Sequence, residues 1–250
     1  MRNLTLTTGK YPTNLRESLT QAFGEISLNT RILLLAAVAA LAAIGFIFMA
    51  QFMLWQVALL VIAAWTPLVV QRCLLLLKRD CKLVVWFGLL VAQTPHMGEH
   101  CAQMVQIHLL GWPWMQSHGI IGGALLDQEW MHFWFDSVLI PFATGYLLCL
   151  YGLKTNRWLW ILLPLALWHC VEHISIVDMY IKTGVPGFPG LLAHGGLIWP
   201  NSPISRPDLH FTYNLFEEAL IALGYRHDLM RSSEPSRCAA RYGQKGEHAR

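Results

Sequence analysis

The chain has 250 residues and a formal net charge of +3, a length that suits one or two domains. Only 13% of its residues are charged and 55% are hydrophobic, whereas soluble proteins carry about 25% charged residues. So few charges exclude a water-soluble globule, and the small positive balance near the expected helix ends gives no sign of nucleic-acid binding. The composition predicts an integral membrane protein.

The first part of the chain divides into a polar segment and a long apolar one. Residues 1–31 are polar and mixed, and we expect a cytoplasmic lead-in there. The apolar run from Ile32 to Leu77 follows. As a single helix it would be about 70 Å long, more than twice the ~30 Å hydrocarbon core of a bilayer. We therefore predict two membrane spans, with a turn near 51–56.

Four further spans complete the expected fold. They are predicted at about 83–110, 130–152, 158–182 and 208–225, ahead of a basic cytoplasmic tail at 226–250. The expected fold class is all-α, a polytopic membrane bundle of about six transmembrane helices that forms one domain over 32–225. Lys and Arg gather in the lead-in, the 78–82 and 154–157 loops and the tail. The positive-inside bias places those segments and both termini in the cytoplasm, as for a bacterial inner-membrane protein.

A motif of two histidines and a glutamate occurs twice in the apolar part of the chain. His96-Met97-Gly98-Glu99-His100 returns as His169-Cys170-Val171-Glu172-His173, 73 residues later (169 minus 96). A second motif, His132 followed by Asp136, returns as His210 followed by Asn214, at an offset of 78 (210 minus 132). The pattern predicts an internal tandem repeat of a two-helix unit, at about 83–152 and 158–225, with a pseudo-twofold axis along the membrane normal.

The repeated motifs predict a metal site near the periplasmic side of the bundle. Residues i, i+3 and i+4 share one helix face, so each motif presents its polar side chains in one direction. One ionisable residue inside a bilayer costs about 2.5–3.5 kcal/mol on insertion scales, which metal binding can offset. The set is too large for one zinc and suits two metals in a bundle. The predicted metal-site residues are His96, Glu99, His100, His132, Asp136, His169, Glu172, His173, His210 and Asn214.

Imidazole and carboxylate ligands suit iron, zinc and copper. We expect two transition-metal ions, with iron favoured and copper or zinc as alternatives. Glu99, Glu172 and Asp136 are the candidate catalytic residues, which would bridge the metals or handle protons. Glu217 shares the helix face of His210 and is either an extra ligand or a proton relay. The arrangement is similar to that of the membrane desaturases and hydroxylases in its intramembrane histidine clusters, although the spacing of the histidines and the side of the membrane differ.

Three classes of function follow from such a site. The favoured one is an oxidoreductase of the oxygenase, hydroxylase or desaturase type, acting on a lipid-soluble substrate, with a redox partner as a further possible component. The second is an intramembrane zinc hydrolase, in which Glu99 or Glu172 activates a metal-bound water. The third is a haem- or pigment-binding electron-transfer subunit, which close pairs of histidines four residues apart do not favour.

Overall fold

The computed structural model describes residues 54–120, 128–152 and 156–231, together with five positions of the preceding apolar segment (37, 38, 41, 42 and 45). The described residues are helical or lie in loops and turns, and they contain no β-strand. The all-α prediction is confirmed for this part of the chain. The expected lead-in, most of the first span, residues 51–53 of the expected turn and the tail beyond Arg231 lie outside the described residues, whereas 54–56 belong to a helix.

Five long helical segments form the fold. Helix α3 covers Leu54–Arg79, and α4 covers Cys81–Met104 and continues as the π-helix η1 over Val105–Leu109. After the short 3-10 turn η2 (Trp114–Gln116), the next helix consists of α5 (Gln128–His132), the π-helix η3 (Phe133–Leu139) and α6 (Ile140–Tyr151). Helices α7 (Arg157–Thr183) and α8 (Arg206–Arg231) follow. Four of these segments lie close to predicted spans, although α8 extends six residues beyond 225.

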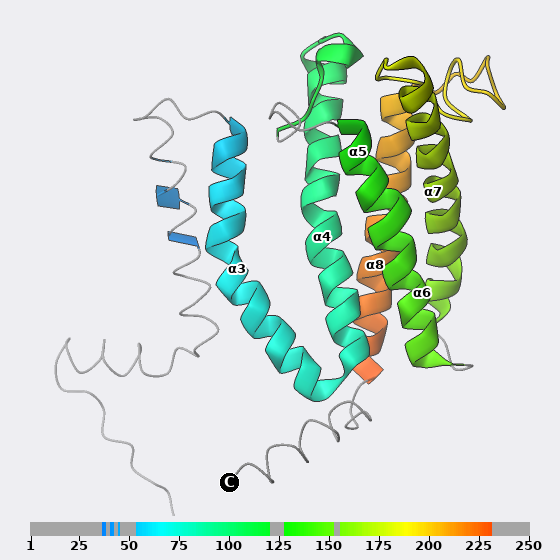
Figure 1. The fold of residues 1–250 in the computed structure, drawn as a ribbon. Helices are drawn as coiled ribbons and strands as arrows, with labels where there is room; N and C mark the ends of the chain where they lie inside the picture. Colours follow the sequence, from blue (N-terminus) through cyan, green and yellow to red (C-terminus); the bar gives the residue numbers. More distant parts are fainter. Residues whose placement is uncertain are drawn as a thin grey trace, which may run out of the picture.

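Successive helices run in opposite directions (Figure 1). Helices α4, α5–α6, α7 and α8 form a bundle, whereas α3 approaches α4 at its carboxyl end and leans away from it at the other (Figure 1). Helix α8 packs against both α4 and α7. The loops after α4 and after α7 consequently lie at the same end of the bundle, so the amino-terminal ends of α5 and α8 lie near each other there.

Within the described residues, three helices are long and apolar enough to cross a membrane. They are the segments Trp55–Arg79, Glu129–Tyr151 and Arg157–Thr183. Helix α4 and helix α8 line the same bundle but carry more polar side chains, among them Gln93 and Glu217, which are buried inside it. The prediction of an all-helical chain is therefore confirmed for the described residues, and three of its helices are candidates for crossing a membrane.

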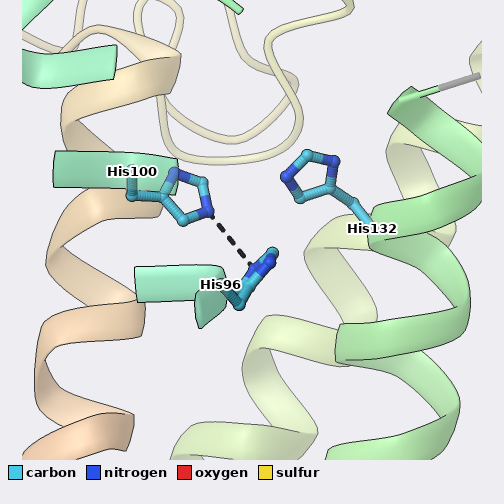
Figure 2. A group of neighbouring side chains, drawn as sticks. All are labelled: His96, His100 and His132. Carbon is cyan, nitrogen blue, oxygen red and sulfur yellow. Dashed lines mark hydrogen bonds between the residues drawn. The ribbon is translucent and has the colours of Figure 1, made fainter. Parts of the chain in front are cut away.

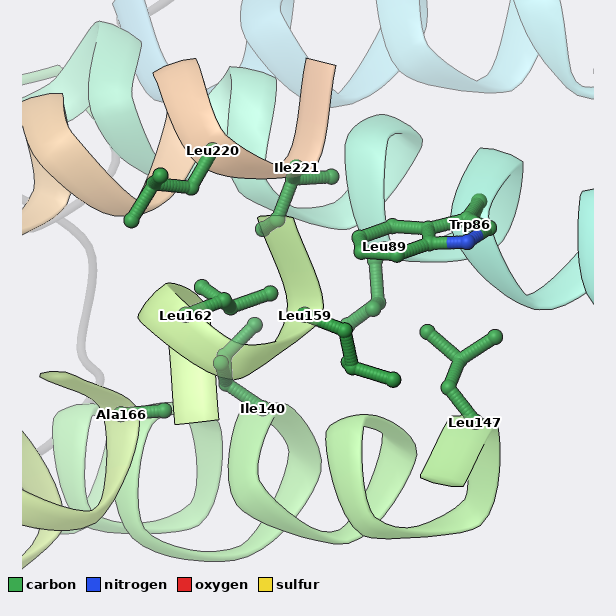
Figure 3. Packing of buried hydrophobic residues seen from close by; sticks show 9 residues of the cluster. All are labelled: Trp86, Leu89, Ile140, Leu147, Leu159, Leu162, Ala166, Leu220 and Ile221. Atoms are coloured by element: carbon green, nitrogen blue, oxygen red, sulfur yellow. The ribbon is translucent and has the colours of Figure 1, made fainter. Parts of the chain in front are cut away.

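The apolar core lies in the half of the bundle away from the two loops. Leu89 of α4, Ile140 and Leu147 of α6, and Leu162 of α7 meet there with Ile221 of α8 (Figure 3). These side chains are nearly or completely inaccessible to solvent. For helices that cross a bilayer the surrounding lipid is as apolar as these side chains, so they stabilise the bundle by close van der Waals packing between helices. This packing fixes the helices that carry the polar side chains described below.

A small polar cluster closes the same end of the bundle. The Trp86 Nε1–H donates to the Tyr151 hydroxyl at 2.8 Å and to Asp228 Oδ2 at 3.1 Å, and the Tyr151 hydroxyl also donates to Asp228. Asn156 Nδ2 donates to the Gly224 carbonyl at 2.8 Å and to Asp228 Oδ1 at 3.1 Å. These hydrogen bonds join helices α4, α6 and α8 to each other and to the residue before α7. They stabilise the end of the bundle opposite the two loops.

We expect Gly224→Ala to destabilise the protein strongly, because a Cβ atom there would overlap the buried indole of Trp86. Overpacking of this kind typically costs about 1–3 kcal/mol. Gly88 of α4 is the matched control, since its Cβ position meets no atom within 4 Å. Gly88→Ala should stabilise its helix by about 0.5–1 kcal/mol. Thermal unfolding in detergent compares the two, and equal melting temperatures would contradict the close Gly224–Trp86 packing.

Two π-helical segments interrupt otherwise regular α-helices. The first, η1, ends the helix that carries His96 and His100, and the second, η3, begins one residue after His132 and contains the buried Asp136. Single-turn π segments are often found at functional sites. Both lie in the half of the bundle next to the loops, which is where the histidines gather.

Candidate metal centre

The first group of histidines comes from α4 and α5. His96 and His100 lie one turn apart on α4, and their Nε2 atoms are 3.3 Å from each other. His132, the last residue of α5, faces both of them, with ring centroids 5.2 Å and 5.5 Å away (Figure 2). One nitrogen from each ring lies within 4.8 Å of the others. We call these three residues the first histidine set.

The second histidine set comes from α7 and α8 in the same way. His169 and His173 lie one turn apart on α7 with their Nε2 atoms 3.1 Å from each other, and His210 of α8 completes the set. All three are buried. For comparison, metal–imidazole bonds of about 2.0–2.1 Å place neighbouring ligand nitrogens roughly 3.0–3.4 Å apart. The nitrogen–nitrogen distances in both helical pairs lie in that range.

Asp136 lies between the two sets. Its Oδ2 atom is 3.1 Å from His173 Nε2 and 3.5 Å from His96 Nε2, so one carboxylate oxygen contacts a histidine of each set. The rings also meet directly, because His132 stacks on His173 with centroids 5.7 Å apart and His173 approaches His210 at 4.7 Å. The six histidines and Asp136 therefore form one continuous cluster at one depth of the bundle.

Two histidines of the second set have an acceptor next to the outer ring nitrogen, whereas His173 Nδ1 has no hydrogen-bond partner. His169 Nδ1 lies 3.1 Å from Glu217 Oε1, and His210 Nδ1 lies 3.0 Å from the Arg206 carbonyl oxygen. An ionised carboxylate and a carbonyl only accept hydrogen bonds, so the Nδ1 atom of each ring carries the proton. The lone pair of Nε2 then points into the cluster. This is the usual arrangement of metal-binding histidines, whose other nitrogen donates to a carboxylate or a backbone carbonyl.

Several buried polar atoms of the cluster make no hydrogen bond within the described structure. They include His210 Nε2, Asp136 Oδ1 and Glu217 Oε2. A buried acceptor without a partner costs about 1–3 kcal/mol, and native proteins contain few of them. Atoms of this kind, together with histidine nitrogens about 3 Å apart, fit a site built for metal ions. The donor set of imidazoles and carboxylates suits a transition metal.

The two motif glutamates point away from the histidines and bind the loops. Glu99 Oε2 accepts from the Ile120 backbone N–H at 2.6 Å. Glu172 accepts from the Leu191 and Leu192 N–H groups at 2.6 Å and 3.1 Å. In each loop the neighbouring glycine has a positive φ and packs against the carboxylate, Gly119 beside Glu99 and Gly190 beside Glu172. Neither glutamate belongs to the groups of mutually close ligand atoms.

We expect Glu172→Gln to loosen the loop after α7 while metal content is retained. The substitution replaces a charged acceptor of two backbone N–H groups, and hydrogen bonds to charged groups contribute about 1.5–3 kcal/mol each. Limited proteolysis should cut the 184–205 loop faster, with metal per chain unchanged. Glu99→Gln is the parallel test on the other loop. Loss of metal in either variant would instead assign that glutamate to the ligand set, as the sequence predicted.

Asn214 also lies at the edge of the site and not among the close ligand atoms. Its Oδ1 accepts from Gln93 Nε2 at 2.7 Å, and its Nδ2 donates to the His210 carbonyl at 2.9 Å. The amide therefore positions His210. Glu217 takes the place nearer the centre, since it lies with Asp136 and His169 in a third group of close ligand atoms. Sequence reasoning did not single out Gln93, although it precedes His96 by three residues on the same helix face.

A salt bridge spans the amino-terminal ends of the two helices that each supply one histidine. Arg206 donates to both oxygens of Glu129, at 2.9 Å and 2.6 Å, and Glu129 also accepts from the Gly187 N–H at 2.9 Å. The Glu129 side chain is 5% exposed and that of Arg206 15% exposed. Each residue stands about one turn before a histidine of the cluster, His132 or His210. Glu129 precedes His132 by three residues and Arg206 precedes His210 by four. These similar positions and the opposite charges are the sequence signal that could have identified the pair.

A cavity of about 370 Å³ lies between the cluster and the loops. His100, His132 and His210 line it from both histidine sets, and the Glu129–Arg206 pair lines its side. Comparison with known proteins gave no matching family model, no matching curated protein and no matching solved structure. The functional conclusion below therefore rests on the chemistry and geometry of the cluster.

Proposed function

We propose that the chain is a membrane-embedded metalloprotein with a dinuclear centre, acting as an oxidoreductase on a lipid-soluble substrate. The observation that carries the proposal is the position of Asp136, whose Oδ2 contacts one histidine of each three-histidine set. A carboxylate between two sets of three imidazoles is a bridging ligand for two ions. Dimetal sites hold their ions ~3.5–4 Å apart, which suits two sets that share one oxygen atom.

Each residue of the centre has a distinct part in the proposal. The first histidine set holds one ion and the second set holds the other, with Asp136 between them. Glu217 orients His169 through its Nδ1 proton. When bound, a pair of iron ions would supply electron transfer to oxygen and oxidation of the substrate. The protein supplies a cavity that presents three of the histidines to the substrate.

The alternatives receive less support from the same contacts. A zinc hydrolase would need Glu99 or Glu172 as a base, and both carboxylates accept hydrogen bonds from loop backbone. A haem or chlorin held between histidines needs room for the macrocycle, whereas the paired Nε2 atoms are 3.3 Å and 3.1 Å apart. Copper also suits imidazole ligands, but the central Asp136 favours iron, which binds carboxylate ligands more readily than copper does.

The proposal includes the arrangement in the membrane. Six spans, with both termini in the cytoplasm of a bacterial cell, would put the two loops and the cavity at the periplasmic face. The tandem repeat would relate α4 and α5–α6 to α7 and α8. It is supported by corresponding contacts, since Glu99 and Glu172 bind their following loops and each two-helix unit supplies three histidines.

Metal analysis of the purified chain tests the central proposal. We expect about two metal ions per chain, mainly iron, with no sharp haem band in the optical spectrum. His100→Ala and His173→Ala remove one ligand from each set, and each should lower the content by about one ion. His108→Ala is the control, because His108 pairs with Asp208 outside both sets. Zinc alone would support the hydrolase, and no bound metal at normal stability would overturn a dinuclear centre.

Reporter fusions test the orientation. A reporter after residue 120 should be periplasmic and one after residue 155 cytoplasmic, because Lys and Arg gather in the 78–82 and 154–157 loops. A cytoplasmic reporter at residue 120 would reverse the face of the membrane to which the cavity belongs. It would leave the histidine cluster itself unaffected, so the two parts of the proposal are tested separately.

A further inference from the structure

The cavity above the cluster has flat, largely apolar walls. Trp114 and Met115 of the first loop and Tyr180 of α7 face it, and Pro186 and Pro207 add two more rigid surfaces. The loop after α4 and the loop after α7 contact each other beside the cavity. A Cβ atom placed at Gly187 would be 3.0 Å from the Trp114 ring and 3.1 Å from Met115 Sδ. The Trp114 indole therefore lies where the two loops meet, on the wall of the cavity.

The charged residues of the cavity neutralise each other. Arg206 gives two hydrogen bonds to the Glu129 carboxylate, at 2.9 Å and 2.6 Å, so both charges are already paired. Gln103 Nε2 donates to the Ser117 carbonyl at 2.7 Å and is likewise committed. The Glu129–Arg206 pair therefore offers no net charge to a ligand. The ligand's polar atoms would face the imidazoles of His100, His132 and His210.

The surroundings of the cavity are apolar and exposed. Leu109 is 77% exposed and Leu110 57% exposed just before the first loop, while Trp112 within that loop is 47% exposed. Val185, next to the lining residue Pro186, is 62% exposed. Large side chains of this kind at one end of a bundle suit the membrane interface, where aromatic and aliphatic residues meet lipid. A ligand that reaches the cavity through this rim can leave a chain in the lipid.

We infer that the cavity binds the neutral, oxygen-bearing ring head group of a membrane amphiphile, of the quinone or phenol type, with its chain outside among the exposed apolar side chains. The identification of this head group as the substrate class rests on the proposed function. The binding site itself rests on the walls alone. Trp114 stacks on the ring, and the three imidazoles of the cavity face its oxygen atom. Stacked aromatic rings gain an attraction beyond their burial, which a straight acyl chain would not obtain.

Photo-crosslinking of the full chain in nanodiscs tests this site. The probe is a benzoquinone that carries a ten-carbon chain with a photoreactive group at the first chain carbon. Mass spectrometry should find crosslinks in the peptides around 112–118 and 180–187. Unlabelled decyl benzoquinone should compete for the site, and decanoic acid at the same concentration should not. Equal competition by decanoic acid would overturn the ring site in favour of one for acyl chains.

Trp114→Ala and Trp160→Ala are matched variants, because both replace a partly exposed tryptophan, with exposures of 41% and 58%. Trp114 lines the cavity, whereas Trp160 lies near the amino-terminal end of α7 and does not line it. We expect Trp114→Ala to weaken probe binding about tenfold, the effect of losing one stacked ring, and Trp160→Ala to leave it unchanged. Equal effects of the two variants would overturn the inference. Thermal unfolding shows that each variant is folded.

The crosslinking is done with metal-loaded and with chelator-treated protein. Ring binding by protein that never holds metal would support the cavity site and overturn the dinuclear centre. Two bound ions per chain without any specific crosslink would support the centre and overturn the ring site. The failure of one proposal can thus be told from the failure of the other.

Discussion

Asp136→Asn is expected to lower the metal content from about two ions per chain to one or none and to abolish activity. The asparagine keeps the shape of the side chain but removes its charge and one of its two ligand oxygens. Asp136 Oδ2 lies 3.1 Å from His173 Nε2 and 3.5 Å from His96 Nε2, so the change affects both histidine sets. Loss of a residue that only orients a ligand costs about 10–100-fold in affinity, and loss of a shared ligand should cost more.

Two further variants are the controls for the metal content of Asp136→Asn. Asp178→Asn removes a carboxylate from α7 that pairs with the exposed Lys182, and it should change neither metal content nor activity. His132→Ala should empty the first histidine set. If Asp136→Asn keeps both ions while His132→Ala loses metal, Asp136 is not a bridging ligand. Plasma mass spectrometry of the purified variants measures all three.

Removal of one partner from the Glu129–Arg206 pair is expected to cost about 3–5 kcal/mol of folding free energy, because it leaves a buried charge without its partner. Arg206→Met and Glu129→Gln should each lower the thermal unfolding midpoint in detergent. The two residues also join the starts of α5 and α8, which carry His132 and His210. We therefore expect weaker metal retention in both variants, measured as the metal left after dialysis against a chelator.

The exposed pair of Lys182 and Asp178 is the matched control for that effect. Its side chains are 63% and 53% exposed, and pairs four residues apart on a helix surface contribute about 0.3–0.5 kcal/mol. Lys182→Met should therefore shift the unfolding midpoint little. The double variant Glu129→Gln with Arg206→Met should lose less stability than the sum of the two single variants, because no charge is left unpaired. An additive double variant would contradict a coupled pair.

Helix positions and the histidine cluster could be predicted from the sequence for a common physical reason. Long apolar runs specify helices, and residues three and four apart specify one helix face, so repeated motifs bring their histidines together. The helices α4, α7 and α8 lie close to the predicted spans, and the six histidines form one cluster. Of the two spans predicted in 32–77, helix α3 covers 54–79, whereas most of the first span and residues 51–53 lie outside the described residues, so the two-span interpretation stays a prediction.

The directions of the carboxylates could not be predicted from helix geometry alone. In the His-x-x-Glu-His motif the glutamate is about 60° around the helix from the first histidine and 100° from the second. It can therefore turn towards the cluster or towards a loop that folds back over the helix. Glu99 and Glu172 turn towards a loop, because Gly119 and Gly190 let the loop backbone approach the carboxylates closely. Such contacts depend on the path of a loop, which periodicity does not describe.

The π-helix η3 changes the register in which the two units of the proposed tandem repeat are aligned. In a regular α-helix, steps of four residues rotate by about 40° each and leave the inner face, yet Asp136, Ile140 and Thr144 are all buried. The wider π turn accommodates one extra residue and restores the phase. On α8 the buried Asn214 stands 78 residues after Asp136, whereas the buried Glu217 and Ile221 stand 77 residues after Ile140 and Thr144. If the proposed tandem repeat relates α5–α6 to α8, its alignment needs a one-residue gap after Asp136. The counterpart of Glu217 is then Ile140, one position beyond the residue that an ungapped comparison would select.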